Sequence, residues 1–559
     1  MVVGLAAGTA GAANVSARKA QDPGAAVATT TPIKHLVVTF QENVSFDHYF
    51  GTYPNATNPV GEPGFTAKKG TPTVNGLSAG LLTNNPNLSN PQRLDRSQAH
   101  TCDQGHGYTQ EEAAEDFGAM DKFVQNTNRG GVTNTLGQCL GTTPTPGNFA
   151  VMDYYDGNTV TALWNYAQRF AMSDNSWDTG FGPSTPGALN VVSGQTFGVV
   201  CSRPGASFAI LNSPGNCPAA PAGTTPANPG VVQQPPAHAG TTFSDSDPYY
   251  DICSNDSITS VQGGQNIGDE LNAAGLSWGF FTGGFAAPGY VPGNPASDNL
   301  SGGHSGAECT SGHIGVGNTG VQADYIPHHE PFQYYQSTAN PLHLPPTSIA
   351  NIGHQDQANH QYDLADFLAA VDNNNMPSVS YLKAPAFEDG HPGYSDPLDE
   401  QTFLVNTLNH LQKSPEWKST AVVIAYDDSD GWYDHAAPTI LFQSQASIDV
   451  AGFCGGATAT IPVGFGQQEQ GRCGYSQRLP MLVISPFSKQ NFVDNTTIDQ
   501  SSVVRFIEDN WLQSERIGNG SADALAGSID TMLDFHKASK AALILDPTTG
   551  LPVKGGRKH

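Results

Sequence analysis

Short apolar runs alternate with amphipathic segments along most of the chain. Runs rich in β-branched and aromatic residues predict strands, and apolar residues three or four positions apart predict helices. The predicted strands cover residues 34–40, 276–282, 378–383, 421–426 and 481–485. The predicted helices cover residues 110–126, 159–172, 188–193, 267–274, 361–373, 400–412 and 499–512. This alternation predicts an α/β fold with a mainly parallel sheet and helices on both faces.

Stretches rich in Gly, Pro and Ala divide the chain. Residues 1–31 resemble a secretory leader with a linker, although the usual basic start is missing. We expect a catalytic domain over residues 32–515, with a long Gly/Pro-rich loop excursion at about 199–265, and a C-terminal extension over 516–559. No apolar run reaches the ~18 residues of a membrane span, so we expect an exported, periplasmic or secreted protein without stable membrane insertion.

Composition narrows the function classes. The 559 residues carry a net charge of −26, which argues against nucleic-acid binding and against a polybasic membrane anchor. The 62 Gly and 40 Pro residues indicate much loop. The eight cysteines form no CxxC pair and suggest disulfides in an oxidising compartment. Cys201/Cys217 and Cys454/Cys473 are close enough along the chain for local pairs, but spacing does not fix the connectivity.

The first candidate site follows the strand predicted at 34–40. Glu42 and Asn43 come directly after it, in QENVSFDHYFG. Ligands bind outside the carboxyl ends of strands in open α/β sheets, and a carboxylate and an amide oxygen suit a hard metal ion. The alternative is an ordinary helix N-terminus capped by Asn43 or Ser45.

A second acidic segment follows the strand predicted at 421–426. Asp427 and Asp428 begin the run DDSDGWYDH. Paired acids at the end of a buried strand repel each other unless a cation or a proton relieves them. A solvated turn is the alternative, since Asp, Ser and Gly are common turn formers. The β-forming residues that lead into the acids favour a metal.

Nucleophile and acid candidates lie in loops. Ser184, in GFGPSTPG, precedes the helix predicted at 188–193, where backbone N–H groups could bind a phosphate. A plain Ser/Thr turn is the alternative. Histidines that could protonate a leaving group or hold phosphate oxygens are His106, His328, His329 and His391.

Six motifs occur together, in the order QENVSFDHYFGTYP, FGPSTPG, DYIPHHEPFQYY, GHPGYSDPLDEQ, YDDSDGWYDH and RLPMLVISPFSK. With them the chain resembles the bacterial phosphoesterase family that contains phospholipases C and acid phosphatases of the AcpA type. The resemblance covers residues 32–515 and implies an alkaline-phosphatase-like core. It also implies phosphate-contacting histidines at His106, His329 and His391, with His328 a less secure neighbour. The implied metal ligands are Glu42, Asn43, Ser184, Asp427 and Asp428.

Four positions depart from the pattern of many members. Val44 stands where Arg is common, Ser184 where many phospholipases C have Thr, and Gly187 where they have Asn. Asp428 stands where Glu is frequent, and its shorter side chain changes the reach of that ligand. The Ser-Thr-Pro-Gly form and HHEPFQYY are more similar to the acid-phosphatase branch.

The resulting hypothesis is a metal-dependent acid phosphatase. Ser184 would attack phosphorus, His106 or His391 would protonate the leaving oxygen, and water would hydrolyse the phosphoserine, at mildly acidic pH. Iron, calcium or zinc could be the single metal ion, with oxygen-rich ligation less typical of zinc. The alternatives are a phospholipase C acting on phospholipid head groups and a secreted, non-catalytic binding protein on a hydrolase scaffold.

Overall fold

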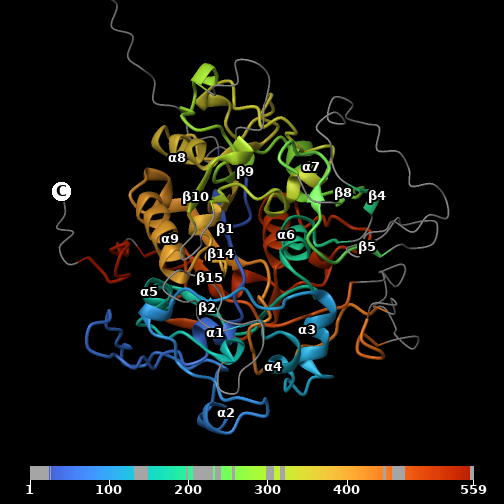
Figure 1. The fold of residues 1–559 in the computed structure, drawn as a ribbon. Coiled ribbons are helices and arrows are strands. Elements are labelled where there is room, and N and C mark those ends of the chain that lie inside the picture. Colours follow the sequence, from blue (N-terminus) through green and yellow to red (C-terminus); the bar gives the residue numbers. More distant parts are fainter. Residues whose placement is uncertain are drawn as a thin grey trace, which may run out of the picture.

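A central sheet with helices on both faces forms the core of this computed structural model (Figure 1). The structure describes residues 24, 27–130, 149–196, 199–204, 231–232, 241–254, 258–297, 308–314, 321–444, 449–455, 472–539 and 541–553. Across the sheet, the strands in these residues are β12 (Gln361–Asp363), β9 (Trp278–Thr282), β13 (Val379–Lys383), β1 (His35–Gln41), β14 (Thr420–Tyr426), β15 (Met481–Ile484), β2 (Ala171–Ser173) and β16 (Phe492–Asp494).

Most neighbouring strands of this sheet run parallel. The five strands from β12 to β14 are parallel to one another, and β2 is parallel to β16. Only β15, among the sheet strands described, is antiparallel to both of its neighbours. The predicted α/β fold with a mainly parallel sheet is therefore confirmed, and so is each of the five predicted strands within two residues of its bounds.

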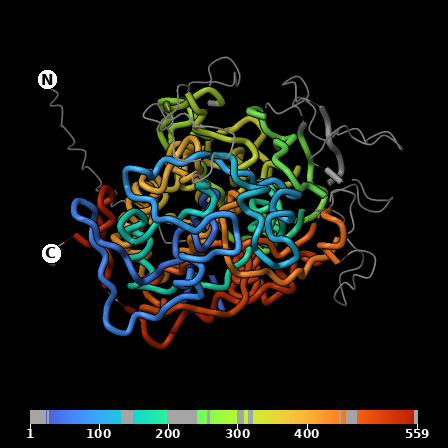
Figure 2. Tube along the Cα trace, turned by 60° about the horizontal axis from the view of Figure 1, so that its bottom comes forward, coloured from blue at the N-terminus to red at the C-terminus, as the bar shows by residue number. Residues whose placement is uncertain are grey.

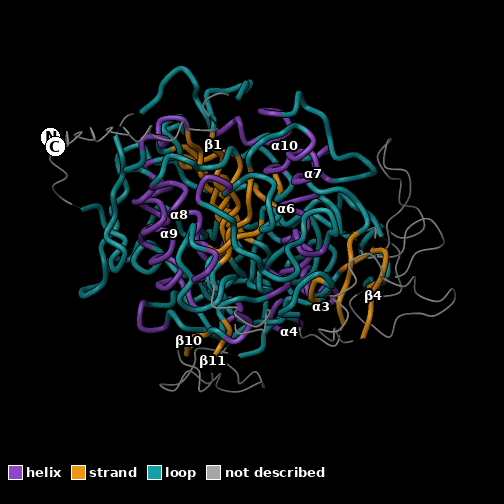
Figure 3. The backbone as a smooth tube through the Cα atoms, turned by 90° about the horizontal axis from the view of Figure 1, so that it is seen from above, coloured by secondary structure: helices purple, strands orange, loops and turns teal. Residues whose placement is uncertain are grey.

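Helices lie on both faces of the sheet, and others lie outside these two layers (Figure 3). Their bounds are α1 (Phe46–Phe50), α2 (Ala79–Thr83), α3 (Tyr108–Glu115), α4 (Phe123–Asn126), α5 (Thr161–Arg169), α6 (Ser184–Ser193), α7 (Ile267–Ala273), α8 (Leu364–Asp372), α9 (Pro397–Leu411) and α10 (Ser502–Trp511). Side chains of α5, α8 and α9 belong to the apolar cluster on one face, and those of α6, α7 and α10 to the cluster on the other.

The alternation of strand side chains explains these two clusters. Successive side chains of a strand point to opposite faces of the sheet. In β14, Val422 and Ile424 pack into the cluster of α8 and α9, whereas Val423 packs into the cluster of α6 and α10. Both faces are apolar because both are covered, as expected for a parallel sheet.

Several predicted helix boundaries were wrong. The helices predicted at 159–172 and 361–373 each include residues of a strand, β2 and β12 respectively. The segment 110–126 is not one helix but the short helices α3 and α4, because Asp116, Phe117 and Met120 between them have φ of 46, 57 and 53°. A right-handed helix cannot continue through left-handed residues. Helix α6 begins at Ser184, before the predicted start at 188, since Pro183 and Pro186 fit its first turn.

Smaller sheets lie outside the core. They pair β4 (Val199–Pro204) and β7 (Asp247–Pro248) with β8 (Ile258–Gln262), β5 (Val231–Val232) with β6 (Thr241–Thr242), β10 (Gly312–Ile314) with β11 (Val321–Ala323), and β3 (Ser176–Trp177) with β17 (Ile498–Asp499). The first two of these sheets fall within the predicted loop excursion. The C-terminal segment packs back on earlier parts of the chain, where Arg96 donates to the carbonyl of Thr548 at 2.9 Å (Figure 2). The domain boundaries themselves stay predictions.

Disulfides link parts of the loop-rich surface. The predicted Cys454–Cys473 pair is confirmed, and Cys253–Cys309 forms a second bridge. The predicted Cys201/Cys217 pair lies outside the described residues, because Cys217 is not among them. None of the described helices combines the length and the apolar character that crossing a membrane would require.

Candidate active site

The two acidic segments meet at the carboxyl edge of the central sheet. Strands β1 and β14 are parallel neighbours, and their register pairs Gln41 with Tyr426. Glu42 therefore leaves the sheet beside Asp427, although 384 positions separate Asn43 from Asp427 in the sequence. Both strands are buried along their whole length, which explains why continuous apolar runs precede the acids.

Helix α6 brings the candidate nucleophile to the same edge. Ser184 is the first residue of this helix, and it is 2% exposed. The helix can approach β14 because of Gly187: a Cβ at that position would lie 1.9 Å from the carbonyl oxygen of Asp427. Gly187, which departs from the family pattern, thus permits the close packing that positions Ser184 at this edge of the sheet. The backbone N–H of Thr185 donates to Oδ1 of Asp245 at 3.0 Å, and phosphate binding by the N–H groups near Ser184 stays a prediction.

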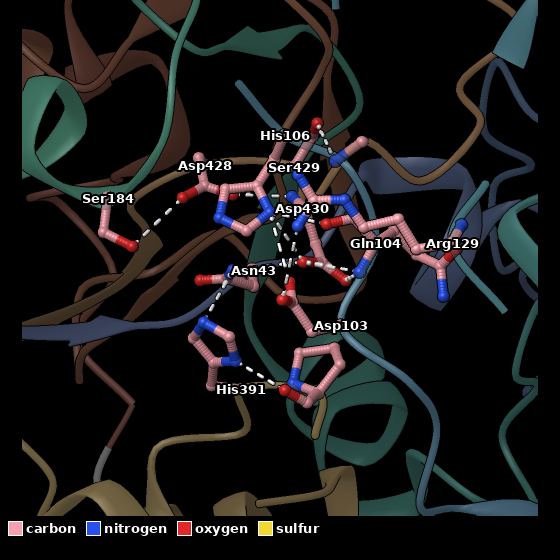
Figure 4. Close-up of polar contacts among 12 residues, drawn as sticks. Asn43, Asp103, Gln104, His106, Arg129, Ser184, His391, Asp428, Ser429 and Asp430 are labelled. Carbon is pink, nitrogen blue, oxygen red and sulfur yellow. Dashed lines mark hydrogen bonds and ion pairs between the residues drawn. The ribbon is translucent and has the colours of Figure 1, made fainter. Parts of the chain in front are cut away.

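Ser184 lies between two carboxylates. Its Oγ is 3.2 Å from Oε2 of Glu42. The same Oγ is 3.2 Å from Oδ2 of Asp428 (Figure 4). A hydroxyl has one hydrogen to donate, so it can satisfy only one of these oxygens at a time. Three oxygens of this kind, all buried, form a group that a cation would stabilise.

Asn43 completes the oxygen-rich group. Its backbone N–H donates to Oδ1 of Asp427 at 2.9 Å, and its φ of 58° is a left-handed value that Asn tolerates. Its Nδ2 donates to Nε2 of His391 at 3.1 Å and to Oδ1 of Asp430 at 3.3 Å. With the amide nitrogen held in this way, Oδ1 of Asn43 has no hydrogen-bond partner, and neither has Oδ2 of Asp427.

These residues fit a hard metal ion. Buried polar atoms are normally hydrogen-bonded, so two buried oxygens without a partner in one acidic group favour cation binding there. Burial, and then the neighbouring Asp427, raises the pKa of Asp428 well above its ordinary value. The pair of Asp427 and Asp428, which was predicted from the sequence, therefore shows the electrostatic repulsion that a metal ion would relieve. Glu42, Asn43, Ser184, Asp427 and Asp428 together offer carboxylate, amide and hydroxyl oxygens, the donor set of a hard cation.

Lys383, which sequence reasoning missed, binds the other oxygen of Glu42. It ends β13, the neighbour of β1, and its Nζ forms a buried ion pair with Oε1 of Glu42. His329 Nδ1 lies 3.2 Å from the same oxygen. Glu42 is thereby held with Oε2 turned to Ser184. The available signal was a lysine at the end of a short strand without other charged residues. The rule that selected Glu42 and Asp427, that sites form at the carboxyl ends of strands, could have selected it too.

His106 has a ring nitrogen bound by acids. Its Nδ1 lies 3.0 Å from Oδ1 of Asp430 and 3.4 Å from Oδ1 of Asp103. Burial alone would lower the pKa of His106, but the carboxylates of Asp428, Asp430 and Asp103 outweigh it and raise the pKa well above its ordinary value. The imidazole is therefore suited to carry a proton.

His391 and His329 are held as neutral rings. His391 Nδ1 lies 2.6 Å from the carbonyl of Pro392, and its Nε2 faces the Asn43 amide. Burial lowers the pKa of His391, and burial together with His328 and His391 lowers that of His329 well below its ordinary value. His328 Nδ1 lies 3.3 Å from Oδ1 of Asp247.

A cavity of about 540 Å³ opens in front of Ser184. Its lining includes all four histidines predicted from the sequence and one arginine, Arg129. Arg129 is half exposed, and its guanidinium lies 3.7 Å from Asp103 and donates to Oε1 of Gln110 at 3.3 Å. Such a volume is within the range of small-molecule sites, about 300–1,000 Å³. The structure thus brings every predicted site residue to one cavity and its floor.

Comparison with known proteins is consistent with this geometry. The model of the Phosphoesterase family matches residues 33–512. This span is more than half of the chain. The chain belongs to the Phosphoesterase family.

Curated relatives of this phosphoesterase include a non-hemolytic phospholipase C of Pseudomonas aeruginosa, 32% identical over 169 residues, which are 29% of this chain and 24% of that protein. Phospholipase C A of Mycobacterium tuberculosis is 29% identical over 150 residues, 25% of this chain and 26% of that one. The matches thus span about a quarter of these relatives. A solved structure of an alkaline phosphatase superfamily protein from Vibrio parahaemolyticus matches with a TM-score of 0.25 and 11% identity, covering 66% of this chain and 64% of the other.

Glu111 is a second residue of this phosphoesterase that sequence reasoning missed. It lies on α3, is fully buried, and accepts from the backbone N–H of Gly182 at 3.0 Å and from Ser429 Oγ at 2.7 Å. It therefore ties the loop before Ser184 to the loop after β14. Burial raises the pKa of Glu111 to about 7. No local pattern in the sequence marks it, because both partners are far along the chain.

Proposed function

We propose that this phosphoesterase is an acid phosphatase, a metal-dependent hydrolase of phosphomonoesters with Ser184 as its nucleophile. The observation that supports the proposal most directly is the position of Ser184 Oγ, 3.2 Å from a carboxylate oxygen of each acidic segment, at the floor of the cavity. A serine hydroxyl is a weak nucleophile until a base or a cation activates it. This position offers a carboxylate as the base and oxygen ligands for a cation.

Ser184 attacks phosphorus in line and passes its proton to an adjacent carboxylate, and the alcohol departs as the O–P bond breaks. Water then hydrolyses the phosphoserine and releases phosphate. When bound by the oxygens of Glu42, Asn43, Asp427 and Asp428, a metal ion would supply Lewis acidity and favour the ionised hydroxyl. Arg129 at the cavity wall stabilises the charge that spreads over the phosphoryl oxygens.

His106 is the better of the two candidate acids. Its Nδ1 is held by Asp430 and Asp103, which leaves Nε2 available to protonate the leaving oxygen. Both nitrogens of His391 are engaged, by Pro392 and by Asn43. His391 thus orients the Asn43 amide so that its oxygen joins the ligand group, a positioning role.

The test is Ser184→Ala, assayed on p-nitrophenyl phosphate with metal supplied. We expect turnover to fall at least about a thousandfold with an unchanged unfolding transition, since the nucleophile acts only in the reaction. Ser193→Ala is the matched control, because Ser193 ends the same helix and its Oγ donates to the carbonyl of Leu189. A Ser184→Ala protein that retains near wild-type turnover removes this residue from the mechanism.

A phospholipase C is the second candidate, supported by the relatives of that name. Rates on p-nitrophenyl phosphate and on phosphatidylcholine, each with and without chelator, separate the two activities. A protein that hydrolyses neither substrate with any metal would be a binding protein on a hydrolase scaffold. We also propose that the protein is exported, which the two described disulfides support, because such bridges persist in oxidising compartments.

A further inference from the structure

A second cavity lies at the same edge of the sheet as the candidate active site. It encloses about 460 Å³ at the carboxyl ends of β9 and β13, between helices α8 and α9. Its main walls are the apolar side chains of Leu364, Phe367, Leu368, Leu382, Phe387 and Phe403. We call this cavity the apolar groove. Its walls suit a hydrocarbon group, because burying apolar surface lowers the free energy by an amount roughly proportional to the buried area.

The apolar groove and the active-site cavity share two wall segments. On β11 and the residue after it, Asp324 lines the groove, while its neighbours Ala323 and Tyr325 line the active-site cavity. In the loop after β13, Phe387 lines the groove, and His391 lines the active-site cavity. The two cavities are therefore adjacent, separated by the width of a single backbone segment.

The carboxylate of Asp324 in the shared wall is paired. Asp324 Oδ1 lies 2.6 Å from Nδ1 of His313, and its Oδ2 accepts from Ser311 at 3.1 Å. The ring of His313 also packs against Phe387, with ring centroids 4.1 Å apart. A hydrocarbon group passing between Asp324 and Phe387 would meet a paired carboxylate and an aromatic ring. Glu388 also lines the groove, and burial raises the pKa of its carboxyl group.

Exposed apolar side chains extend from the groove. Leu368 of α8 is 41% exposed although it belongs to the groove wall. On the β10–β11 hairpin, which carries His313, Ile314 is 73% and Val321 is 67% exposed. Large exposed apolar side chains on elements that border a cavity favour an apolar ligand there.

We propose that the apolar groove binds a hydrocarbon chain carried by the alcohol part of the phosphoester. The phosphoryl group lies at Ser184, and the chain crosses the shared wall beside Phe387 and enters between α8 and α9. The inference rests on the proposed function for the position of the phosphoryl group. It applies equally to a monoester and to a diester, because the chain belongs to the alcohol that leaves.

The experiment measures binding rather than turnover. The metal-loaded protein is titrated calorimetrically with n-alkylphosphonates from methyl to decyl, below their micellar concentrations. The carbon–phosphorus bond is not hydrolysed by ester cleavage, so the affinities do not depend on the mechanism. We expect the dissociation constant to fall about threefold to fourfold for each added methylene until the groove is full.

Two variants place a charge in the groove. Leu368→Glu and the isosteric Asn406→Asp, at an exposed position of α9 in the groove lining, should each weaken decylphosphonate binding at least about tenfold. Methylphosphonate binding should not change, because neither residue lines the active-site cavity. Leu88→Glu is the matched control, since Leu88 is 67% exposed and outside both cavities.

Each outcome decides the proposal. Affinities that do not depend on chain length in the wild type, or a chain-length dependence that survives in both groove variants, would overturn it. If the wild-type protein binds decylphosphonate but no methylphosphonate, and Leu368→Glu weakens decylphosphonate binding, the result supports the groove. The same result contradicts the phosphoryl site at Ser184. A protein that binds neither phosphonate overturns both.

Discussion

Two clusters of buried acids lie on the same two segments of the chain, yet they differ in how their negative charge is balanced. The ligand cluster contains Glu42, Asp427 and Asp428, at the points where β1 and β14 end. The arginine cluster contains Asp47 and Asp434, a few residues farther along each segment. All of these carboxylates are buried to 1% exposure or less.

The arginine cluster supplies its own cation. The guanidinium of Arg478 lies 3.0 Å from Asp434 and 3.4 Å from Asp47, and its remaining donors bind the carbonyls of Asn75 and Asp174. His435 Nδ1 lies 2.6 Å from Asp47. In the ligand cluster, oxygens of Asn43 and Asp427 have no partner. Acidic spacing alone therefore does not reveal a metal site. The two clusters differ in how far the chain's own cation reaches, because Arg478 binds both acids of its cluster, whereas Lys383 pairs with Glu42 and leaves Oδ2 of Asp427 without a partner.

The largest expected effect comes from Asp427→Asn. Loss of a ligand carboxylate should lower metal affinity and turnover by at least about a thousandfold, because even outer partners of a ligand contribute 10–100-fold. The metal-free protein should unfold at the same or a higher denaturant concentration, since a repelling charge is gone. Elemental analysis, the phosphatase assay and denaturant unfolding measure the three quantities.

Asp434→Asn is the matched control for that substitution. The same chemical change in the arginine cluster should reduce stability and leave metal affinity within about twofold, because Asp434 is a partner of Arg478. If Asp434→Asn also abolished metal binding, the distinction between the two clusters would be wrong.

The second expected effect is on stability. Arg478→Met should lower the free energy of unfolding by about 3 kcal/mol or more, because removing one partner of a buried ion pair leaves uncompensated charge. Asp47 and Asp434 would both lose a donor. Urea unfolding of the metal-free proteins measures the difference. A loss below about 1 kcal/mol would mean that the two acids find protons or water instead.

The third expected effect tests whether Lys383 supports or opposes the metal. Lys383→Met should weaken metal binding about tenfold, because Glu42 loses the partner that holds its Oε1 and turns Oε2 to Ser184. Calorimetric titration of metal into chelator-treated protein measures the affinity. Lys489→Met is the control, since Lys489 binds the carbonyl of Thr531 away from the site. Tighter metal binding in Lys383→Met would show that the ammonium competes with the cation.

Much of the ligand cluster was predictable because each ligand follows a recognisable element. Glu42 and Asp427 each follow an uninterrupted apolar strand, and Ser184 follows a Gly/Pro turn. The carboxyl-edge rule then joins segments that are hundreds of positions apart. The metal and phosphate roles of these residues stay predictions, whereas their meeting at one edge is observed.

The partners of those residues were not predictable from local pattern. Glu111 contacts Gly182 and Ser429 only through tertiary packing, and its own helix looks like any surface helix with several acids. The break after α3 was missed for a similar reason: apolar spacing suggested that Phe117 continues a buried stripe, but it is 63% exposed. Residue propensity and apolar spacing describe one segment of the chain at a time. These features depend instead on which other segments pack against that segment.

The smallest expected effect concerns pH and His435 in the arginine cluster. Burial alone would lower the pKa of His435, but the Asp47 carboxylate outweighs it and raises the pKa. A histidine with a raised folded-state pKa stabilises the fold fully below its ordinary value of about 6.5, and loses that contribution as pH rises through the folded-state pKa. His435→Asn, whose amide can replace Nδ1–H, should therefore reduce stability by about 1 kcal/mol at pH 6 and much less at pH 9. Urea unfolding of both metal-free proteins across this range measures it, and a difference that grows with pH would contradict the charged His435–Asp47 pair.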